Sequence, residues 1–265
     1  MTDTIRDRVT YELVDRVARI ELARGGALNS LDRQMGDAFR SAADRAAKDA
    51  ASGDARVVVV SAQGRVFSVG GDLAQFGSVP DRGAEVQATA DGLHAGLATL
   101  RALAVPVVSV INGTAAGGGL GIALVGDIVI AAAEAKLVMA YTASALSPDC
   151  GLTSTIPQRL SWARAMDLAL TNRVLTGAEA ADWGLVSRAV PAAELGATVD
   201  AVVSSLRDGP SGALAATKRL MAESPDRLFS DQLDQEAATI SRLIVEPDGV
   251  EGVDAFLAKR TPTYR

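Results

Sequence analysis

The sequence predicts an α/β fold that is followed by a helical C-terminal region. Three short aliphatic runs have the composition of buried parallel strands, and segments with helical periodicity separate them. After about Pro191 only helical patterns remain, with breaks at glycines and prolines. We therefore expect an α/β core over residues 1–190 and a helical region over residues 191–265. The three strand predictions are Val57–Val60, Val107–Ile111 and Ile128–Ala131.

The N-terminal segment predicts a β-hairpin and then a helix. Two runs of alternating residues flank the turn Asp15-Arg16, so a hairpin is expected over Val9–Leu22. The helix that follows is expected to have Asn29 or Ser30 as its N-cap and Asp32 in its first turn.

Two further helices are expected in the core. Val86, Ala90 and Leu93 keep helical spacing within a helix predicted from about Ala84 to Leu103. A second, tightly packed helix is predicted over Gly117–Val125.

The bulk composition excludes several classes of protein. With 265 residues, of which 48% are hydrophobic and 4% aromatic, the chain can bury a large core of small aliphatic side chains. A formal net charge of −6 argues against a nucleic-acid partner. Cys150 is the single cysteine, and the polar start Met1–Thr10 lacks the apolar segment of a signal peptide. We therefore expect a cytoplasmic protein without an internal disulfide.

One uncharged run is long enough to span a bilayer. It extends from Ala102 to Gly126. Pro106, the pair Asn112-Gly113 and the triplet Gly117-Gly118-Gly119 interrupt it, so the run fits a strand, a turn and a buried helix better than one membrane helix. No membrane span is expected.

Two glycine-rich segments suggest a site for a negatively charged oxygen. Val69-Gly70-Gly71-Asp72 follows a strand pattern, and Gly117-Gly118-Gly119 opens a predicted helix. Glycines let a backbone N–H approach a ligand closely, and two such N–H groups could converge on one oxygen as an oxyanion hole. The same glycines could instead serve tight turns and close packing. The triplet has no following Lys-Ser/Thr and no Gly-x-Gly-x-x-Gly spacing, so neither nucleotide-binding motif is present.

These segments belong to a longer series of motifs that resembles the crotonase superfamily, the enoyl-CoA hydratase/isomerase family. The series covers nearly the whole chain, and its order and spacing make it specific. In order, the matching pieces are Ala27-Leu28-Asn29-Ser30-Leu31, Phe67-Ser68-Val69-Gly70-Gly71-Asp72-Leu73, Pro106-Val107-Val108, Ile111-Asn112-Gly113-Thr114-Ala115-Ala116-Gly117-Gly118-Gly119-Leu120, Asp127-Ile128, Leu175-Thr176-Gly177, Trp183-Gly184-Leu185-Val186 and Phe256-Leu257-Ala258-Lys259-Arg260.

The resemblance implies a fold, a substrate and an assembly. The fold would be a spiral of ββα units with C-terminal helices that join subunits into a trimer or a hexamer. The substrate would be an acyl-CoA thioester, with no permanently bound cofactor. The backbone N–H groups of Val69 and Gly118 would form the oxyanion hole. Phe256 and Lys259 would meet the CoA nucleotide of a neighbouring subunit. The other residues implied to hold CoA are Ala27, Leu28, Ser68, Gly70, Asp72 and Leu73.

The chain departs from the family's hydratases at the two catalytic glutamates. The matching positions here are Gly121 and Tyr141, and neither can act as a general base. Hydration by the usual two-carboxylate route is therefore not expected. Tyr141 could donate a hydrogen bond in the pocket or simply line it.

One carboxylate, Asp149, remains as a candidate acid/base. It lies in Pro148-Asp149-Cys150-Gly151, a turn that resembles the Pro-Asp-x-Gly turn of phenylacetate-type enoyl-CoA isomerases. A poorly solvated carboxylate beside an apolar pocket is a competent proton shuttle. It could remove a proton from the α-carbon of a thioester, which forms an enolate, and return that proton two carbons away. Turn chemistry or a helix N-cap could also explain Asp149.

The same aspartate, with His94, also resembles 4-chlorobenzoyl-CoA dehalogenases. That family has a nucleophilic aspartate at the position of Asp149 and a histidine at that of His94, the chain's only histidine. Tyr141 and Leu93 replace two of its tryptophans, and His94 could simply flank the apolar stripe of its helix.

The first choice is enoyl-CoA isomerisation through an enolate. An atypical hydratase, a dehalogenase or thioesterase and a non-catalytic acyl-CoA-binding protein are the alternatives. One histidine and one cysteine without ligand spacing give no support to a metal site, and no Gly-x-Ser-x-Gly elbow of a serine hydrolase occurs.

Overall fold

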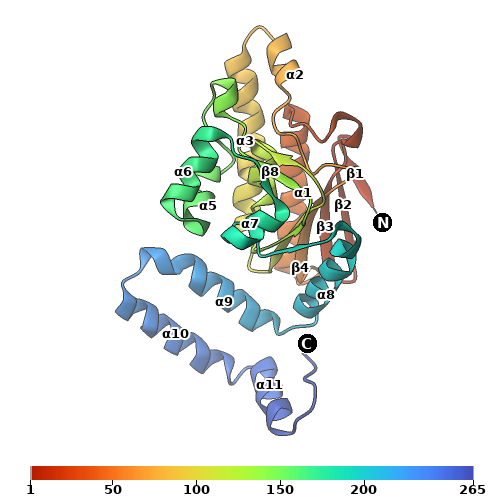
Figure 1. Ribbon diagram of the computed structural model, residues 1–265. Helices are drawn as coiled ribbons and strands as arrows, with labels where there is room; N and C mark the ends of the chain where they lie inside the picture. Colours follow the sequence, from red (N-terminus) through yellow and green to blue (C-terminus); the bar gives the residue numbers. More distant parts are fainter. Residues whose placement is uncertain (1, 265) are drawn as a thin grey trace.

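The computed structural model describes residues 2–264 and contains two sheets with helices packed around them (Figure 1). The larger sheet has seven strands in the order β1-β2-β3-β4-β5-β7-β10, and the smaller has the order β6-β8-β9. The strands are β1 Asp3–Ile5, β2 Val9–Val14, β3 Val17–Leu22, β4 Val57–Ala62, β5 Val107–Ile111, β6 Ala115–Ala116, β7 Ile128–Ala132, β8 Lys136–Val138, β9 Leu175–Thr176 and β10 Arg188–Val190.

Most helices lie between the strands in the chain, as the alternating pattern predicts, and the last four follow β10. Short 3-10 turns lie at Gly25–Ala27, Thr142–Ser144, Ala192–Glu194 and Ser224–Asp226. The α-helices are α1 Arg33–Ser52, α2 Leu73–Ser78, α3 Arg82–Arg101, α4 Gly118–Ala123, α5 Leu152–Arg159, α6 Trp162–Thr171, α7 Gly177–Trp183, α8 Leu195–Arg207, α9 Ser211–Glu223, α10 Phe229–Leu243 and α11 Pro247–Leu257.

The predicted N-terminal hairpin and the buried parallel strands are confirmed. β2 and β3 pair antiparallel around Asp15 and Arg16, which both have positive φ as a tight two-residue hairpin turn requires. β3, β4, β5, β7 and β10 are parallel neighbours. The four consecutive valines of β4 are all buried, so both faces of this central strand are covered, as in a parallel sheet within a core.

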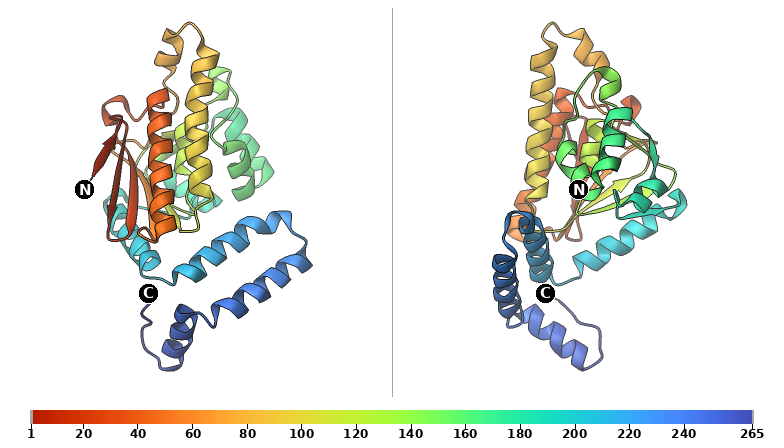
Figure 2. Two further views of the ribbon diagram at one scale, coloured as in Figure 1. Left: turned by 180° about the vertical axis from the view of Figure 1, so that it is seen from behind. Right: turned by 60° about the vertical axis from the view of Figure 1, so that its left-hand side comes forward.

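Helices α1 and α3 lie side by side against one face of the larger sheet (Figure 2). Glycines permit their close approach: a Cβ added at Gly36 would lie 2.7 Å from the carbonyl oxygen of Thr89. The predicted N-cap of α1 was wrong. Asn29 and Ser30 precede the helix, and Asp32 is the cap because its carboxylate accepts a hydrogen bond from the Met35 N–H over 2.7 Å.

The helical C-terminal region divides at Gly209-Pro210. α8 packs on the sheet, whereas α9, α10 and α11 form an arm that extends away from the core (Figures 1 and 2). Lys218 on α9 ties the base of the arm to the core by an ion pair with Asp127 at 2.8 Å. Among residues 2–264, no helix combines the length and the apolar character that crossing a membrane requires.

Candidate active site

A cavity of about 400 Å³ lies between the N-terminal half of α3, the start of α4 and the loops after β4 and β8. Apolar side chains and backbone form most of its wall. It brings together seven of the residues that the sequence singled out, which are Val69, Gly70, Leu73, His94, Gly118, Tyr141 and Asp149.

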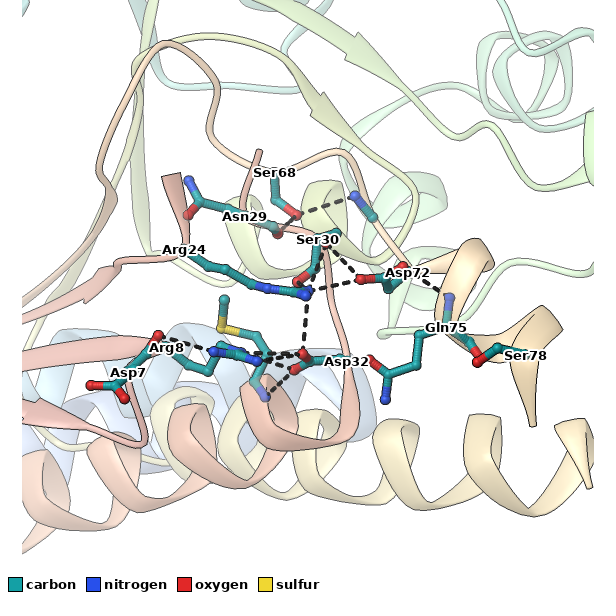
Figure 3. Close-up of polar contacts among 12 residues, drawn as sticks. Asp7, Arg8, Arg24, Asn29, Ser30, Asp32, Ser68, Asp72, Gln75 and Ser78 are labelled. Atoms are coloured by element: carbon teal, nitrogen blue, oxygen red, sulfur yellow. Dashed lines mark hydrogen bonds and ion pairs between the residues drawn. The ribbon is translucent and has the colours of Figure 1, made fainter. Parts of the chain in front are cut away.

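The loop that carries Val69 and Gly70 is held from beneath by buried hydrogen bonds (Figure 3). The Ser68 hydroxyl donates to the Asn29 carbonyl oxygen over 2.7 Å and accepts from the Gly70 N–H over 3.1 Å. Asn29 in turn donates from its amide to the Phe67 carbonyl oxygen over 3.0 Å. Because Ser68 is fully buried, its side chain fixes the loop and does not face the cavity.

A group of two arginines and two aspartates joins this loop to the start of α1 (Figure 3). Arg24 pairs with Asp72 at 2.8 Å and with Asp32 at 3.2 Å, and Arg8 pairs with Asp32 at 3.0 Å. The Asp72 carboxylate also caps α2 by accepting from the Gln75 N–H. Burial alone raises the pKa of Asp72, but the Gln75 N–H and the Arg24 guanidinium outweigh it and lower this pKa below its ordinary value of 3.8.

Glycines bring the two predicted oxyanion-hole segments into contact. Gly70 has φ of 86°, and a Cβ there would lie 2.8 Å from the Ala116 carbonyl oxygen and 3.4 Å from the Gly117 Cα. Gly118 is the first residue of α4, where a backbone N–H has no acceptor within the helix. The Val69 N–H donates to the Leu28 carbonyl oxygen over 3.2 Å, so a ligand oxygen would have to replace Leu28 at this donor.

Asp149 projects into the cavity from a tight turn before α5. Cys150 and Gly151 both have positive φ, 49° and 75°, and the second of them begins α5 as its N-cap. The alternative that Asp149 is the helix N-cap is therefore wrong. A Cβ added at Gly118 would lie 3.7 Å from Asp149 Oδ1, which places the carboxylate beside the predicted oxyanion hole.

Tyr141 and His94 flank the two oxygens of this carboxylate. The Tyr141 hydroxyl donates a short hydrogen bond to Oδ1, and His94 Nε2 lies 3.8 Å from Oδ2. Burial, and after it the charge of Asp149, raises the pKa of Tyr141 far above its ordinary value of 10.0. The phenol therefore stays protonated and acts as a hydrogen-bond donor at neutral pH.

His94 has a fixed partner of its own, because the Cys150 N–H donates to its Nε2 over 3.2 Å. In this arrangement the lone pair of Nε2 is the acceptor of the backbone bond, which fixes the orientation of the ring beside Asp149. His94 lines the cavity beside Asp149, and its role in the chemistry stays a prediction.

The positions of the two missing hydratase glutamates have different surroundings. Tyr141 lines the cavity. Gly121 lies under the Asp149 turn, where a Cβ would come within 2.4 Å of the Cys150 Cβ and 2.5 Å of its carbonyl oxygen. Any side chain at residue 121 would displace Cys150, so this backbone cannot hold a glutamate there without moving.

The expectation that no residues have metal-ligand spacing needs a correction. His94, Asp149 and Cys150 place one ligand atom each within 4.8 Å of one another. Two of these residues already have protein partners at those groups, the Cys150 N–H on Nε2 and the Tyr141 hydroxyl on the carboxylate. Burial, followed by the charge of Asp149, raises the pKa of the Cys150 thiol, which opposes the thiolate that a metal needs.

The remaining predicted CoA contacts lie outside the cavity. Ala27 and Leu28 form the turn beneath the Val69 loop, and the Asp72 side chain is engaged by Arg24. Phe256 and Lys259, at the end of α11, do not line the cavity, and Phe256 is 82% exposed. Contacts of these residues with CoA stay predictions.

Several residues that matter here were missed. Arg24 joins the loops through its ion pairs with Asp32 and Asp72. A single arginine after a strand does not by itself predict such a role, and the two aspartates are the sequence feature that could have indicated it. Helical spacing predicts only a stripe on α3 for Val86 and Ala90. They line the cavity together with Phe76 and Thr89, because the N-terminal half of α3 extends past the sheet.

The chain is similar to known proteins over nearly its whole length. The family model described as Enoyl-CoA hydratase/isomerase matches residues 12–265. A Rhodobacter capsulatus protein named "Probable enoyl-CoA hydratase" is 34% identical over 257 residues, 97% of each chain. The 1,2-epoxyphenylacetyl-CoA isomerase of Escherichia coli is 34% identical over 253 residues, 94% of each chain.

Solved structures of enoyl-CoA hydratases share this fold. A crystal structure of an enoyl-CoA hydratase from Polaromonas sp. JS666 superposes with a TM-score of 0.89 at 30% identity, covering 97% of this chain and all of the other. This confirms the crotonase-type fold that the motif series implied. The chain therefore belongs to the enoyl-CoA hydratase/isomerase family of the crotonase superfamily, whose enzymes act on CoA thioesters without a permanently bound cofactor.

Proposed function

We propose that this enzyme isomerises an enoyl-CoA, with Asp149 as the single acid/base. The observation that carries the proposal is the position of Asp149, whose carboxylate lies beside Gly118 in an apolar cavity and receives a hydrogen bond from Tyr141. A double-bond shift needs one base that takes a proton from the thioester's α-carbon and returns it two carbons away. Water activation of the family's usual kind needs two carboxylates.

The enolate oxygen would be held by the backbone N–H groups of Gly118 and Val69. Developing negative charge on the thioester oxygen favours two donors in a water-poor site. The Val69 N–H donates to the Leu28 carbonyl oxygen over 3.2 Å, which is near the long end for such hydrogen bonds. A negatively charged enolate oxygen is a stronger acceptor than this carbonyl oxygen and would replace it. The name of the Escherichia coli relative, an acyl-CoA isomerase, adds support for an isomerase.

A second candidate is dehalogenation of an aroyl-CoA. The proximity of His94 Nε2 to Asp149 Oδ2, 3.8 Å, favours it, because a nucleophilic carboxylate would need a neighbouring base to activate water for release of the product. Tyr141 argues against it, since its hydroxyl already holds the other carboxylate oxygen.

Assembly is part of the proposal. The C-terminal arm exposes large apolar side chains on α10 and α11, and subunits would join through it into a trimer or hexamer. Phe256 and Lys259 would then reach the CoA of a neighbour. A cytoplasmic location stays a prediction that rests on the single cysteine.

The test is a panel of saturated, 2-enoyl, 3-enoyl and 4-chlorobenzoyl CoA thioesters in D2O, followed by mass spectrometry. We expect double-bond migration and deuterium incorporation with the wild type, and loss of both by at least about 100-fold in Asp149→Asn, a range typical of a lost general base. Asp200→Asn, an exposed carboxylate on α8, is the matched control and should retain full activity.

Each of the other possible outcomes would indicate a different function. Water addition without migration would indicate a hydratase with an atypical route. Chloride release would indicate the dehalogenase, and free CoA a thioesterase. Tight CoA binding without any product from the panel would overturn the proposal in favour of a non-catalytic acyl-CoA-binding protein.

A further inference from the structure

A second cavity adjoins the candidate active site, and His94 and Cys150 line both. It has a volume of about 430 Å³. Its wall comes from the C-terminal half of α3 and the start of α5, with Arg101, Ser154 and Thr155 among its polar residues. Arg101 bridges the two helices by donating to Thr155 Oγ1 over 3.3 Å and to the Gln158 amide oxygen over 3.1 Å. The second cavity therefore has polar side chains of its own and shares His94 with the first.

Three side chains lie at the Asp149 carboxylate, because the Cys150 thiol hydrogen-bonds to it in addition to the contacts of Tyr141 and His94. Oδ1 accepts from Tyr141, whereas Oδ2 faces His94 Nε2 at 3.8 Å. The Asp149 side chain is 38% exposed without a ligand, and that exposure opens into the first cavity. An acyl group in that cavity would displace its water. His94, with a 48% exposed side chain, would still have the second cavity beside it.

Neither of the other two neighbours can pass this proton on. The Tyr141 phenol and the Cys150 thiol both have raised pKa values because they are buried beside the Asp149 charge. Each holds its own proton at neutral pH, and the Cys150 thiol is almost completely buried. His94 is the remaining described neighbour of the carboxylate, it lines both cavities, and an imidazole can accept a proton on one ring nitrogen while the other carries its own.

We propose that His94 is a proton relay that links Asp149 to the water of the second cavity, and that it decides whether the abstracted proton returns to the substrate or exchanges with solvent. This inference rests on the proposed function, because it concerns the fate of the proton that Asp149 removes. His94 acts through Asp149 and does not touch the reacting carbons.

The relay moves one proton out to solvent and one proton back. Asp149, protonated by the substrate's α-carbon, gives that proton to His94 Nε2, which regenerates the carboxylate and leaves an imidazolium. Nε2 then loses its hydrogen bond from the Cys150 N–H and gains a charge-assisted bond with Asp149. The imidazolium releases its Nε2 proton to water, Nε2 takes a solvent proton in its place, and that solvent-derived proton returns through Asp149 to the enolate. No net charge or electron is left over.

The relay predicts a partition that can be measured. In D2O, direct return by Asp149 gives product without deuterium, whereas passage through His94 gives deuterated product. The quantity of interest is therefore deuterium per migrated double bond, with EDTA present so that a cation at His94, Asp149 and Cys150 plays no part. A role of His94 in packing alone would change the rate and leave this ratio unchanged.

His94→Gln is the main variant, because the amide oxygen can still accept from the Cys150 N–H but cannot carry a proton. We expect deuterium per turnover to fall about fivefold or more while migration continues. Ser154→Trp, at an exposed residue that lines only the second cavity, should produce the same fall with His94 intact and serves if His94→Gln does not fold. Asp200→Asn should keep the wild-type ratio.

The outcomes separate the two proposals. Wild-type migration with an unchanged deuterium ratio in both His94→Gln and Ser154→Trp would overturn the relay and leave the isomerase intact. Absence of migration from every substrate with the wild type, or its persistence in Asp149→Asn, would overturn the proposed function itself.

Discussion

Three side chains surround Asp149, and the fold constrains each of them differently. Burial raises the pKa of both Tyr141 and Cys150 and so keeps them as a phenol and a thiol, whereas the Cys150 N–H donates to His94 Nε2. The phenol and the thiol keep their own protons, which leaves His94 as the neighbour that the proposed relay uses. This arrangement suits proton transfer better than metal binding, which would require the thiol to ionise.

The buried tyrosines provide a pH-dependent prediction. Burial raises the pKa of Tyr141 and, with the hydrogen bond to Asp49, that of Tyr11, both above the ordinary value of 10.0. A raised pKa in the folded state contributes stability that is complete below pH 10 and is lost as pH rises beyond it. We expect these two phenols not to ionise in the native protein at pH 11, as measured by absorbance at 295 nm.

Two single substitutions serve as controls for that titration. Tyr11→Phe and Tyr141→Phe should each remove one phenol from the late phase that accompanies alkaline unfolding, and neither should alter ionisation below pH 11. A native-state ionisation near pH 10 that either substitution removes would show that the corresponding hydroxyl is exposed.

The candidate site was predictable in its chemistry but not in its connections. Asp149, Val69 and Gly118 were found because their motifs occur in a fixed order. The link between Asp149 and His94 joins segments more than fifty residues apart, and nothing local in the sequence encodes it. Val86 shows a different limit of the sequence. An apolar residue at helical spacing predicts a core position, but Val86 lines the cavity because its part of α3 extends past the sheet.

At the scale of elements, α4 shows why glycines recur in this site. The helix is six residues long and wholly buried, and Gly121 is packed against the backbone of Cys150. The absent hydratase glutamate and the Asp149 turn are thus alternatives in space: the turn occupies the volume that a side chain at residue 121 would need.

Gly121→Ala tests this packing. A methyl group 2.4 Å from the Cys150 Cβ must move the turn, so we expect a loss of about 1–3 kcal/mol in the free energy of unfolding and a fall in turnover. Denaturant titration and the isomerase assay measure both. Gly196→Ala on α8, where a Cβ meets nothing within 4 Å, is the matched control and should be neutral or slightly stabilising. An unaffected Gly121→Ala would mean that the turn relaxes freely.

The Arg24 group gives a second prediction at this scale. Arg24→Met leaves Asp72 with only its Ser30 and Gln75 donors, whereas Asp32 keeps Arg8. We expect a loss of about 3 kcal/mol at pH 7, at the lower end for breaking a buried ion pair. The control Arg40→Met, which removes an exposed partner of Asp44, should cost at most about 1 kcal/mol.

The acid dependence of the Arg24 variant supplies an independent check. Because the pKa of Asp72 lies below 3.8, its contribution to stability is present above that pH and is lost as pH falls further. Arg24→Met should reduce this acid-induced loss. Equal slopes of stability against pH below 3.8 for the wild type and the variant would show that Arg24 does not stabilise the Asp72 charge.

At the scale of the whole molecule, the order of secondary-structure elements was predictable and their spatial arrangement was not. Aliphatic runs such as β4 and β5 identify buried strands, since only a covered parallel sheet accepts them. The return of β10 to pair with β7, and the division of the C-terminal region into a packed α8 and a projecting arm, depend on tertiary contacts. The Lys218–Asp127 pair that anchors the arm spans two segments with no common motif.

The arm carries many large apolar side chains that the described chain leaves exposed. Ile240, Val245 and Phe256 are mostly exposed, and a monomer rarely tolerates such a surface. We expect the purified protein to be an oligomer by light scattering, and the double variant Ile240→Glu with Phe256→Glu to shift its mass to that of a single 27.2 kDa chain. Buried charges without partners at a subunit contact cost several kcal/mol, enough to dissociate it at micromolar concentration. Val14→Glu, at an exposed apolar residue of the N-terminal hairpin, should leave the mass unchanged. If the wild type were monomeric at all concentrations, the arm would have to bind a different partner. The candidate active-site cavity would then be complete within one chain.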